Sequence, residues 1–440
     1  MISNRIDRPA KRTDQIHHKL IPTGVLVPFV LVTALFFLWG IPNNLNDVLI
    51  RQFMKSFAIT RFKAGLVQSA FYLGYFVLSM PAAFMMRKYG YKAGLIFGLL
   101  LYSAGTFLFW PAAITQSYNF FLIALFVIAS GLAFLETGSS PFIAQIGDPE
   151  SSERRLNFCQ AFNPLGSITG VLVGTAFIFS GIELTPPQIA AMKAAGQYAP
   201  YLRNETLRVI TPYLVLGCIV LLWAFLLART RFPKVGGESE SESADHGRLL
   251  DLLRYPHFLE AVIAQFFYVG AQVGTWSYFI PYVQEYTHVT EKAAGYFLTG
   301  TLVAFAVGRF SATYLMQFVR PNVLMGIYSL ANVALVAVGV WFPGWLGLWA
   351  IFLTSFFMSL MFPTIFGLGL KELGPNTKLG GSLIVMAIIG GAIFTPLMGL
   401  LSQWLSMAKA MLIPFGCYVF ITYFSFIGSR VRVRRIGAAS

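Results

Sequence analysis

The first long apolar stretch of the chain, residues 25–50, reads VLVPFVLVTALFFLWGIPNNLNDVLI. It carries a single charged side chain, Asp47, and it is long enough to cross the roughly 30 Å hydrocarbon core of a bilayer as a helix. The residues before it are polar and include five Lys and Arg, and no small-residue cleavage site follows it. We therefore interpret this stretch as a first membrane span that is retained, and not as a signal peptide that is removed.

Stretches of the same kind recur along the whole chain. They cover residues 62–86, 93–115, 118–147, 155–180, 210–229, 258–287, 292–318, 322–342, 345–371, 379–404 and 408–428. Of the 440 residues, 56% are hydrophobic and 11% are charged, whereas soluble domains average about 25% charged residues. The sequence therefore predicts an all-α membrane protein with 12 transmembrane helices.

A polar segment divides these helices into two sets of six. Residues 236–243 read GGESESES, a low-complexity run that is typical of a flexible linker. We predict a tail at 1–24, a six-helix half at 25–229, a linker at 230–257, a second six-helix half at 258–429 and a basic tail at 430–440. Two weakly similar six-helix halves with a binding site between them resemble the major facilitator architecture.

The positions of the basic residues predict the orientation. Of the 32 Lys and Arg residues, 23 lie in the two tails, the linker and the loops on the same side. Because cytoplasmic loops carry the excess of Lys and Arg, we expect both termini to be cytoplasmic, in the inner membrane of a bacterium. The closing Arg430, Arg432, Arg434 and Arg435 are typical of an anchor to anionic lipids.

Other features exclude several classes of protein. The net charge of +14 does not indicate nucleic-acid binding, because no basic stripe alternates with exposed aromatic residues. The three cysteines have no C-x-x-C spacing, and the five histidines fall in tails, loops or helix ends, so we expect no metal and no cofactor. Neither a phosphate-binding loop nor a catalytic motif is present, which argues against an ATP-driven pump and an enzyme. We expect a monomer surrounded by lipids.

Only two acidic residues, Asp47 and Glu136, have apolar helix on both sides, and an intramembrane charge indicates function. Asn43 and Asn44 precede Asp47 by one turn and share its face, which gives a patch suited to hydroxyl groups and to a titratable site. Alternatively, these asparagines only hold helices together. Glu136 has small residues beside it, and its one candidate basic partner, Arg309, is expected near a cytoplasmic helix end.

Further polar residues share helix faces in the fifth and seventh spans. Gln160 and Asn163 lie three residues apart, and Gln265, Tyr268, Gln272 and Trp276 form a stripe. Amides beside aromatic rings suit a sugar, which offers both hydroxyl groups and apolar C–H faces. An aromatic stripe is also compatible with simple packing.

Taken together, these residues resemble the L-fucose:proton symporter family of the major facilitator superfamily, from about residue 28 to residue 430. The segments that carry the resemblance are FFLW (36–39), NNLND (43–47), QSAFY (68–72), LET (135–137), YVGAQ (268–272), WSY (276–278) and PTIF (363–366). The resemblance implies a proton-coupled importer of L-fucose or a related hexose that works by alternating access. It implies proton coupling by Asp47 and Glu136, and sugar binding by the residues Glu136, Asn44, Gln160, Asn163, Gln272, Trp39 and Trp276.

Two departures from the family affect the expected substrate. Ser139-Ser140 stands where close relatives show Ala-Asn, and Phe362 stands where fucose carriers have tyrosine, so selectivity can shift to another sugar. A sodium-coupled or uncoupled hexose carrier has the same architecture and stays open. A multidrug exporter is expected to have fewer amides in its cavity, and a receptor needs a soluble domain that no loop here is large enough to form.

Overall fold

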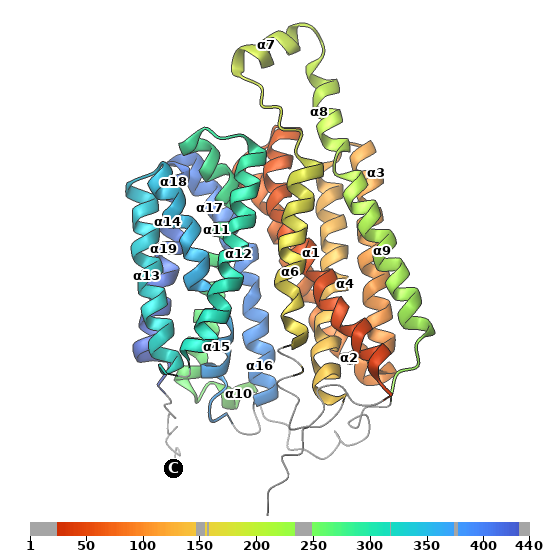
Figure 1. Ribbon diagram of the computed structural model, residues 1–440, viewed down its shortest axis with the longest axis vertical. Helices are drawn as coiled ribbons and strands as arrows, with labels where there is room; N and C mark the ends of the chain where they lie inside the picture. Colours follow the sequence, from red (N-terminus) through yellow and green to blue (C-terminus); the bar gives the residue numbers. More distant parts are fainter. Residues whose placement is uncertain are drawn as a thin grey trace, which may run out of the picture.

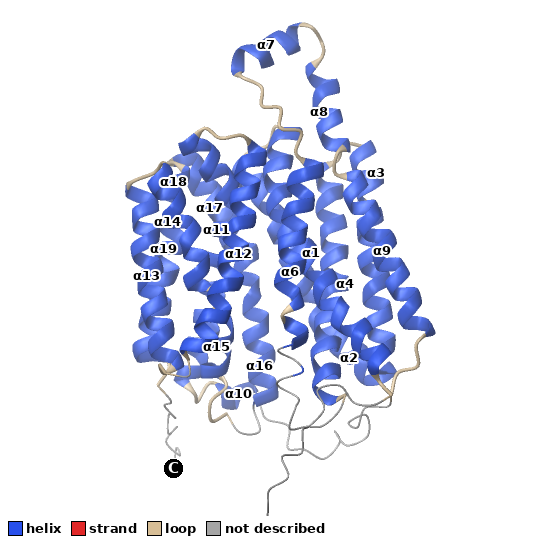
Figure 2. Ribbon diagram, in the orientation of Figure 1, coloured by secondary structure: helices blue, strands red, loops and turns tan. Residues whose placement is uncertain are grey.

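The computed structural model describes residues 24–146, 155, 158–233, 249–316, 318–373 and 377–430. The predicted GGESESES linker lies outside these residues, as do the predicted tails except at their inner ends. Within the described part of the chain every regular element is helical, as Figure 2 shows.

The helices of residues 26–229, called the N half below, are α1 (Leu26–Ser56), α2 (Arg61–Phe107), α3 (Phe109–Ile114), α4 (Tyr118–Gln145), α6 (Phe162–Val173), η2 (Gly174–Ile178), α7 (Pro186–Ala194), α8 (Tyr198–Leu207) and α9 (Ile210–Arg229). α2 contains two membrane crossings, since Gly90 interrupts it with a φ of 82°, a conformation that glycine adopts without strain.

The helices of residues 249–428 are α10 (Leu249–Leu252), α11 (Pro256–Thr287), α12 (Glu291–Leu315), α13 (Pro321–Trp341), α14 (Trp345–Met358), α15 (Met361–Gly369), α16 (Thr377–Met386), η4 (Ala387–Ile389), α17 (Gly390–Trp404), α18 (Met407–Ala410), α19 (Leu412–Tyr423) and η5 (Phe424–Gly428). From α11 onward they are called the C half.

Eleven helical segments of the described residues are long and apolar enough to cross a membrane. The remaining long helix is α11, which has 32 residues but carries amide side chains such as Gln265 and Gln272 along its length. A helix that lines a polar site is less apolar than its neighbours, so α11 completes the predicted set of twelve.

Figure 1 shows the N half on one side of the molecule and the C half on the other, with their long helices roughly side by side. The name tail end is used for the end of the bundle at which α1 begins and at which η5 finishes. The opposite end, from which α7 and α8 project, is the arm end. This projecting segment lies between the predicted spans 155–180 and 210–229, where no helix was predicted. Thr185 and Gln188 form a capping box that starts α7.

Side-chain caps mark the arm-end turns. Thr60, Ser117, Thr290 and Ser406 each accept a hydrogen bond from the backbone N–H three residues later, at the first turn of α2, α4, α12 and α18. Such caps satisfy amide groups that have no partner inside the helix, and they fix where each membrane crossing starts.

Glycines bring α1 and α6 into close contact. A Cβ atom on Gly40 would lie 2.4 Å from the carbonyl oxygen of Asn163, and one on Gly166 would lie 2.1 Å from that of Phe37. Small residues allow this approach of two backbones in a membrane. The contact fixes Asn163 of α6 beside the NNLND segment of α1.

Buried charges join the two halves at the arm end. Lys55 Nζ lies 2.9 Å from Glu291 Oε1 and 3.3 Å from Glu205 Oε2, and Glu291 has no exposed side-chain surface. Nearby, the Arg61 guanidinium pairs with Glu285. In the last turns of α1, Arg51 and Lys55 both lie within salt-bridge distance of carboxylates. These partners explain why α1 extends to Ser56, beyond the predicted end at residue 50.

Candidate functional site

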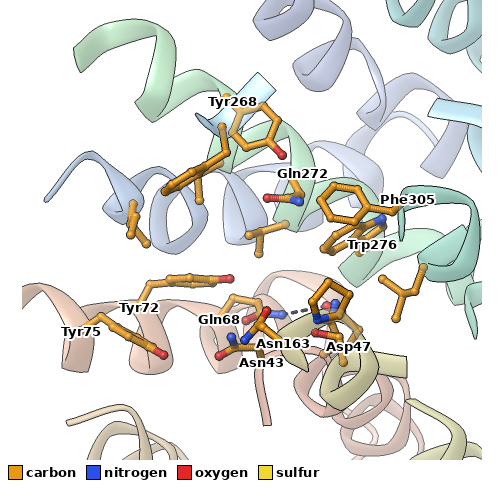
Figure 3. A pocket seen from close by; sticks show the side chains of 18 of the residues that line it. Asn43, Asp47, Gln68, Tyr72, Tyr75, Asn163, Tyr268, Gln272, Trp276 and Phe305 are labelled. Atoms are coloured by element: carbon orange, nitrogen blue, oxygen red, sulfur yellow. Dashed lines mark hydrogen bonds between the residues drawn. The ribbon is translucent and has the colours of Figure 1, made fainter. Parts of the chain in front are cut away.

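A cavity of about 200 Å³ lies between the halves, near the middle of the bundle. Figure 3 shows polar side chains of α1, α2 and α6 facing aromatic and amide side chains of α11 and α12. The lining residues are Asn43, Asn44, Asp47, Gln68, Tyr72, Tyr75, Glu136, Asn163, Pro164, Ser167, Tyr268, Val269, Gln272, Val273, Trp276, Leu302, Phe305, Arg309, Phe362 and Ile388.

The cavity is closed on its arm side. In the described part of the chain, hydrogen bonds and ion pairs connect the two halves from the arm end down to about the level of Asp47. None of those recorded for the described residues joins the halves on the tail side of the cavity. The cavity is therefore shut off from the arm end.

Asp47 is held by three hydrogen-bond donors. Its Oδ1 accepts from Ser277 Oγ at 2.8 Å and from Gln68 Nε2 at 2.9 Å, and its Oδ2 accepts from Asn44 Nδ2 at 3.1 Å. The side chain is 2% exposed and has no basic partner within salt-bridge distance among the described residues. Burial without a counter-charge makes proton binding a natural way to neutralise such a group.

Glu136 is in a different situation, although it lines the same cavity. It makes no hydrogen bond or ion pair with any described residue. A carboxyl group whose oxygens have no protein partner can accept hydrogen bonds from a ligand. The two acids are therefore distinguished by their surroundings: one is satisfied inside the protein, and the other is free to face the cavity.

Arg309 also lines the cavity, which was not predicted. It lies in the last turns of α12, which ends at Leu315, in keeping with its expected place near a helix end. Its guanidinium stacks over the Phe305 ring at 4.9 Å, and its Nε donates to the Ser359 carbonyl oxygen at 3.3 Å. Within the described residues it has no carboxylate partner. The cavity thus holds one cation and two acidic groups.

Besides aliphatic side chains and Arg309, the C half contributes four aromatic rings and one amide. Trp276 meets Phe305 edge to face at 5.2 Å, and its indole N–H donates to Ser355 Oγ at 3.0 Å, which fixes the ring. Gln272 lies between Tyr268 and Trp276 along α11 (Figure 3). An amide flanked by rings offers both hydrogen bonds and apolar contact to a polyhydroxylated solute.

The structure brings most of the predicted site residues together. Those that line the cavity are Asn44, Asp47, Glu136, Asn163, Gln272 and Trp276. Two others do not line it. Trp39 is buried, with its ring centroid 4.4 Å from that of Phe36, and Gln160 is exposed just before the start of α6. Gln160 and Asn163 share a helical face in the sequence, yet only Asn163 reaches the cavity.

Other lining residues were not predicted as site residues. They include Gln68, Tyr72, Tyr75, Phe305 and Arg309. For Gln68 and Tyr72 the QSAFY segment was a usable signal, because it interrupts an apolar span with polar side chains. For Phe305 nothing in the local sequence distinguishes it from lipid-facing phenylalanines.

A bundle of twelve crossing helices in two halves, with ionisable groups in a central cavity and no soluble domain among the described residues, defines a membrane transporter. The family model of the Major Facilitator Superfamily matches residues 29–378. This chain belongs to that superfamily.

Two relatives with curated descriptions match over most of their length. The L-fucose-proton symporter of Escherichia coli (strain K12) is 44% identical over 405 residues, which cover 91% of this chain and 92% of the relative. A glucose/galactose transporter of Brucella abortus biovar 1 (strain 9-941) is 31% identical over 405 residues, which cover 91% of this chain and 93% of the relative.

Solved structures show the same fold. The superfamily transporter FucP in its outward conformation has a TM-score of 0.69 and 42% identity, covering 92% of this chain and 99% of that chain. A D-xylose-proton symporter has a TM-score of 0.69 at 14% identity, covering 92% of this chain and 97% of that chain. This likeness shows the fold alone.

Proposed function

We propose that this chain is a secondary active importer that couples the entry of a monosaccharide, L-fucose or a related hexose, to the entry of protons. The observation that carries the proposal is the cavity, where Asp47 and Glu136 face amides and aromatic rings suited to a sugar. The relatives described as an L-fucose-proton symporter and a glucose/galactose transporter support this substrate class.

The physical basis of coupling is the cost of buried charge. Two acidic groups in a membrane cavity resist burial while they are ionised, and binding a proton removes that charge. A proton that enters down a gradient provides about 2.3 kcal/mol per 100 mV and about 1.4 kcal/mol per pH unit. One proton can therefore sustain a sugar gradient of a few hundredfold, at about 1.4 kcal/mol per factor of ten.

In this proposal the arm end faces the periplasm and the tail end faces the cytoplasm of a bacterial inner membrane. The structure then corresponds to an inward-facing state, since its arm side is closed by the contacts of Lys55 and Arg61 with Glu291 and Glu285. Rocking of the halves about the cavity would break these contacts and open the site to the periplasm.

The direct test is uptake of labelled sugars into right-side-out membrane vesicles. We expect L-fucose to accumulate when an inward proton gradient is imposed, and we expect a protonophore to abolish accumulation. A panel of glucose, galactose, mannose and arabinose defines selectivity. Accumulation that follows a sodium gradient at constant pH would show that the carrier is coupled to sodium instead.

Gln272→Ala is expected to weaken sugar binding by about 1–3 kcal/mol, because a buried hydroxyl of the ligand loses its amide partner. The matched control is Gln160→Ala, which removes the same side chain from an exposed position outside the cavity lining and is expected to change affinity by less than twofold. Titration calorimetry on the purified protein measures both. Equal effects of the two variants would contradict the placement of the site at Gln272.

The orientation predicts which positions can be labelled from outside the cell. A cysteine that replaces Ala195 on the projecting arm should react with a membrane-impermeant maleimide in intact cells, whereas one that replaces Ser241 in the predicted linker should not. Both are made in a background in which the exposed Cys218 is replaced by serine. The reverse labelling pattern would invert the topology.

A further inference from the structure

We propose that Ser277 of α11, together with Gln68 of α2, links the charge state of Asp47 to the closure of the arm end. The inference deepens the proposed function and rests on it, since it assigns to these positioning residues the step in which the carrier releases its proton.

The three side chains form a closed set of hydrogen bonds. Ser277 Oγ donates to Asp47 Oδ1 at 2.8 Å, and Gln68 Nε2 donates to the same oxygen and to Ser277 Oγ, at 2.9 Å each. The relative exposures are 2% for Asp47, 1% for Gln68 and 0% for Ser277. Water therefore does not compete for these bonds in this state.

Two of these three bonds cross the boundary between the halves. Asp47 and Gln68 belong to α1 and α2 of the N half, whereas Ser277 belongs to α11 of the C half. The next residue, Tyr278, donates its hydroxyl to the Arg61 carbonyl oxygen at 2.8 Å, which ties this part of α11 to the arm-end contacts. Opening of the arm end separates α11 from the N half and removes the Ser277 donor, while Asn44 and Gln68 stay beside Asp47.

This geometry makes the environment of Asp47 depend on the state of the carrier. Hydrogen bonds that end on a carboxylate stabilise its charged form, and such bonds are about twice as strong as neutral ones. The charged form is thus favoured while the arm end is closed, when Ser277 is in place. Import requires this dependence of the charge state on closure, because the proton must bind while the arm end is open and leave after the arm end has closed.

Other ionisable groups lie near Asp47. The cavity also contains Tyr72 and Tyr75 of α2, Glu136 of α4, Tyr268 of α11 and Arg309 of α12, while α6 lines it without an ionisable side chain. On α1 itself Arg51 is one turn further, and its guanidinium lies 3.7 Å from Glu183. None of these groups is hydrogen-bonded to Asp47 in the described structure, so among its recorded partners Ser277 alone comes from the other half.

The test compares Ser277→Ala with Ser69→Ala in right-side-out vesicles, with L-fucose as the probe. Both variants remove a hydroxyl that bridges the halves, since Ser69 Oγ donates to the Ala392 carbonyl oxygen at 2.6 Å, but only Ser277 touches Asp47. Uptake is measured at fixed external pH while the internal pH is varied. Exchange of L-fucose at equal pH on both sides is measured in the same preparations.

We expect Ser277→Ala to need an internal pH about one unit higher for half-maximal uptake, a tenfold change in proton concentration, because the charged form has lost a donor. Exchange, which needs no proton release, should persist, and Ser69→Ala should keep the profile of the parent. A Ser277→Ala profile that superimposes on the parent's, or equal shifts in both variants, would overturn the inference.

Gln68→Leu provides a second variant in case Ser277→Ala does not exchange sugar. It removes the other donor to the same oxygen, and an unshifted profile for it would then overturn the inference. A parent protein whose net uptake of L-fucose does not respond to an imposed proton gradient would instead contradict the proposed function, so the two failures can be told apart.

Discussion

Asp47→Asn is expected to abolish accumulation of sugar against a gradient while binding and exchange survive. The amide keeps the size of the side chain and an oxygen that can accept from Ser277 or Gln68, but it has no proton to exchange. The proton gradient, at about 2.3 kcal/mol per 100 mV and about 1.4 kcal/mol per pH unit, limits the ratio of internal to external sugar to a few hundredfold. In Asp47→Asn this ratio should fall to one.

Uptake and exchange in the same vesicles measure this separation. A carrier without a coupling group still moves labelled sugar in exchange for unlabelled sugar, which serves as the internal control for folding. If Asp47→Asn and Glu136→Gln both still accumulated sugar in a pH-dependent way, neither acid could be the coupling group and proton symport would be excluded.

Glu136→Gln is expected to damage binding as well as coupling. Glu136 has no hydrogen-bond partner among the described residues, so the groups that satisfy it must come from a ligand or from water. Loss of hydrogen bonds to a charged group is worth about 1.5–3 kcal/mol, which is about a 10- to 150-fold loss of sugar affinity.

Ser139→Ala provides a matched control on the same helix. Ser139 lies almost one turn after Glu136, but it is fully buried and outside the cavity lining, so its loss should leave affinity within about twofold. Binding to the purified variants is measured by calorimetry. If Asp47→Asn and Glu136→Gln abolished binding and transport equally, coupling and recognition could not be assigned to separate residues.

The sequence predicted the number of helices and the two acids for a simple physical reason. Every crossing needs about 20 apolar residues, so spans can be counted, and an acid with apolar sequence on both sides stands out. Asp47 and Glu136 were found in this way, and both line the cavity.

Helix rotation and contacts between distant segments could not be predicted in the same way. Gln160 and Asn163 are equivalent by helical spacing, but α6 begins at Phe162 and only Asn163 is held against α1. Arg309 was expected near a helix end and lies in the last turns of α12, but its place in the cavity lining, beside a stacked ring and a carbonyl group, was not predicted. The bond between Ser277 and Asp47 joins residues 230 positions apart, and no local pattern encodes it.

The close approach of α1 and α6 restricts how this carrier can diversify. At Gly40, Gly166 and Gly170 a Cβ atom would lie 2.1 to 2.4 Å from a backbone carbonyl oxygen of the other helix, so no larger residue fits without separating them. Evolution can therefore hardly alter the backbone that presents Asn43, Asn44 and Asn163. New sugar preferences are more accessible through side-chain exchange on the opposite wall, at positions such as Phe362, and a mutational library aimed at selectivity should begin there.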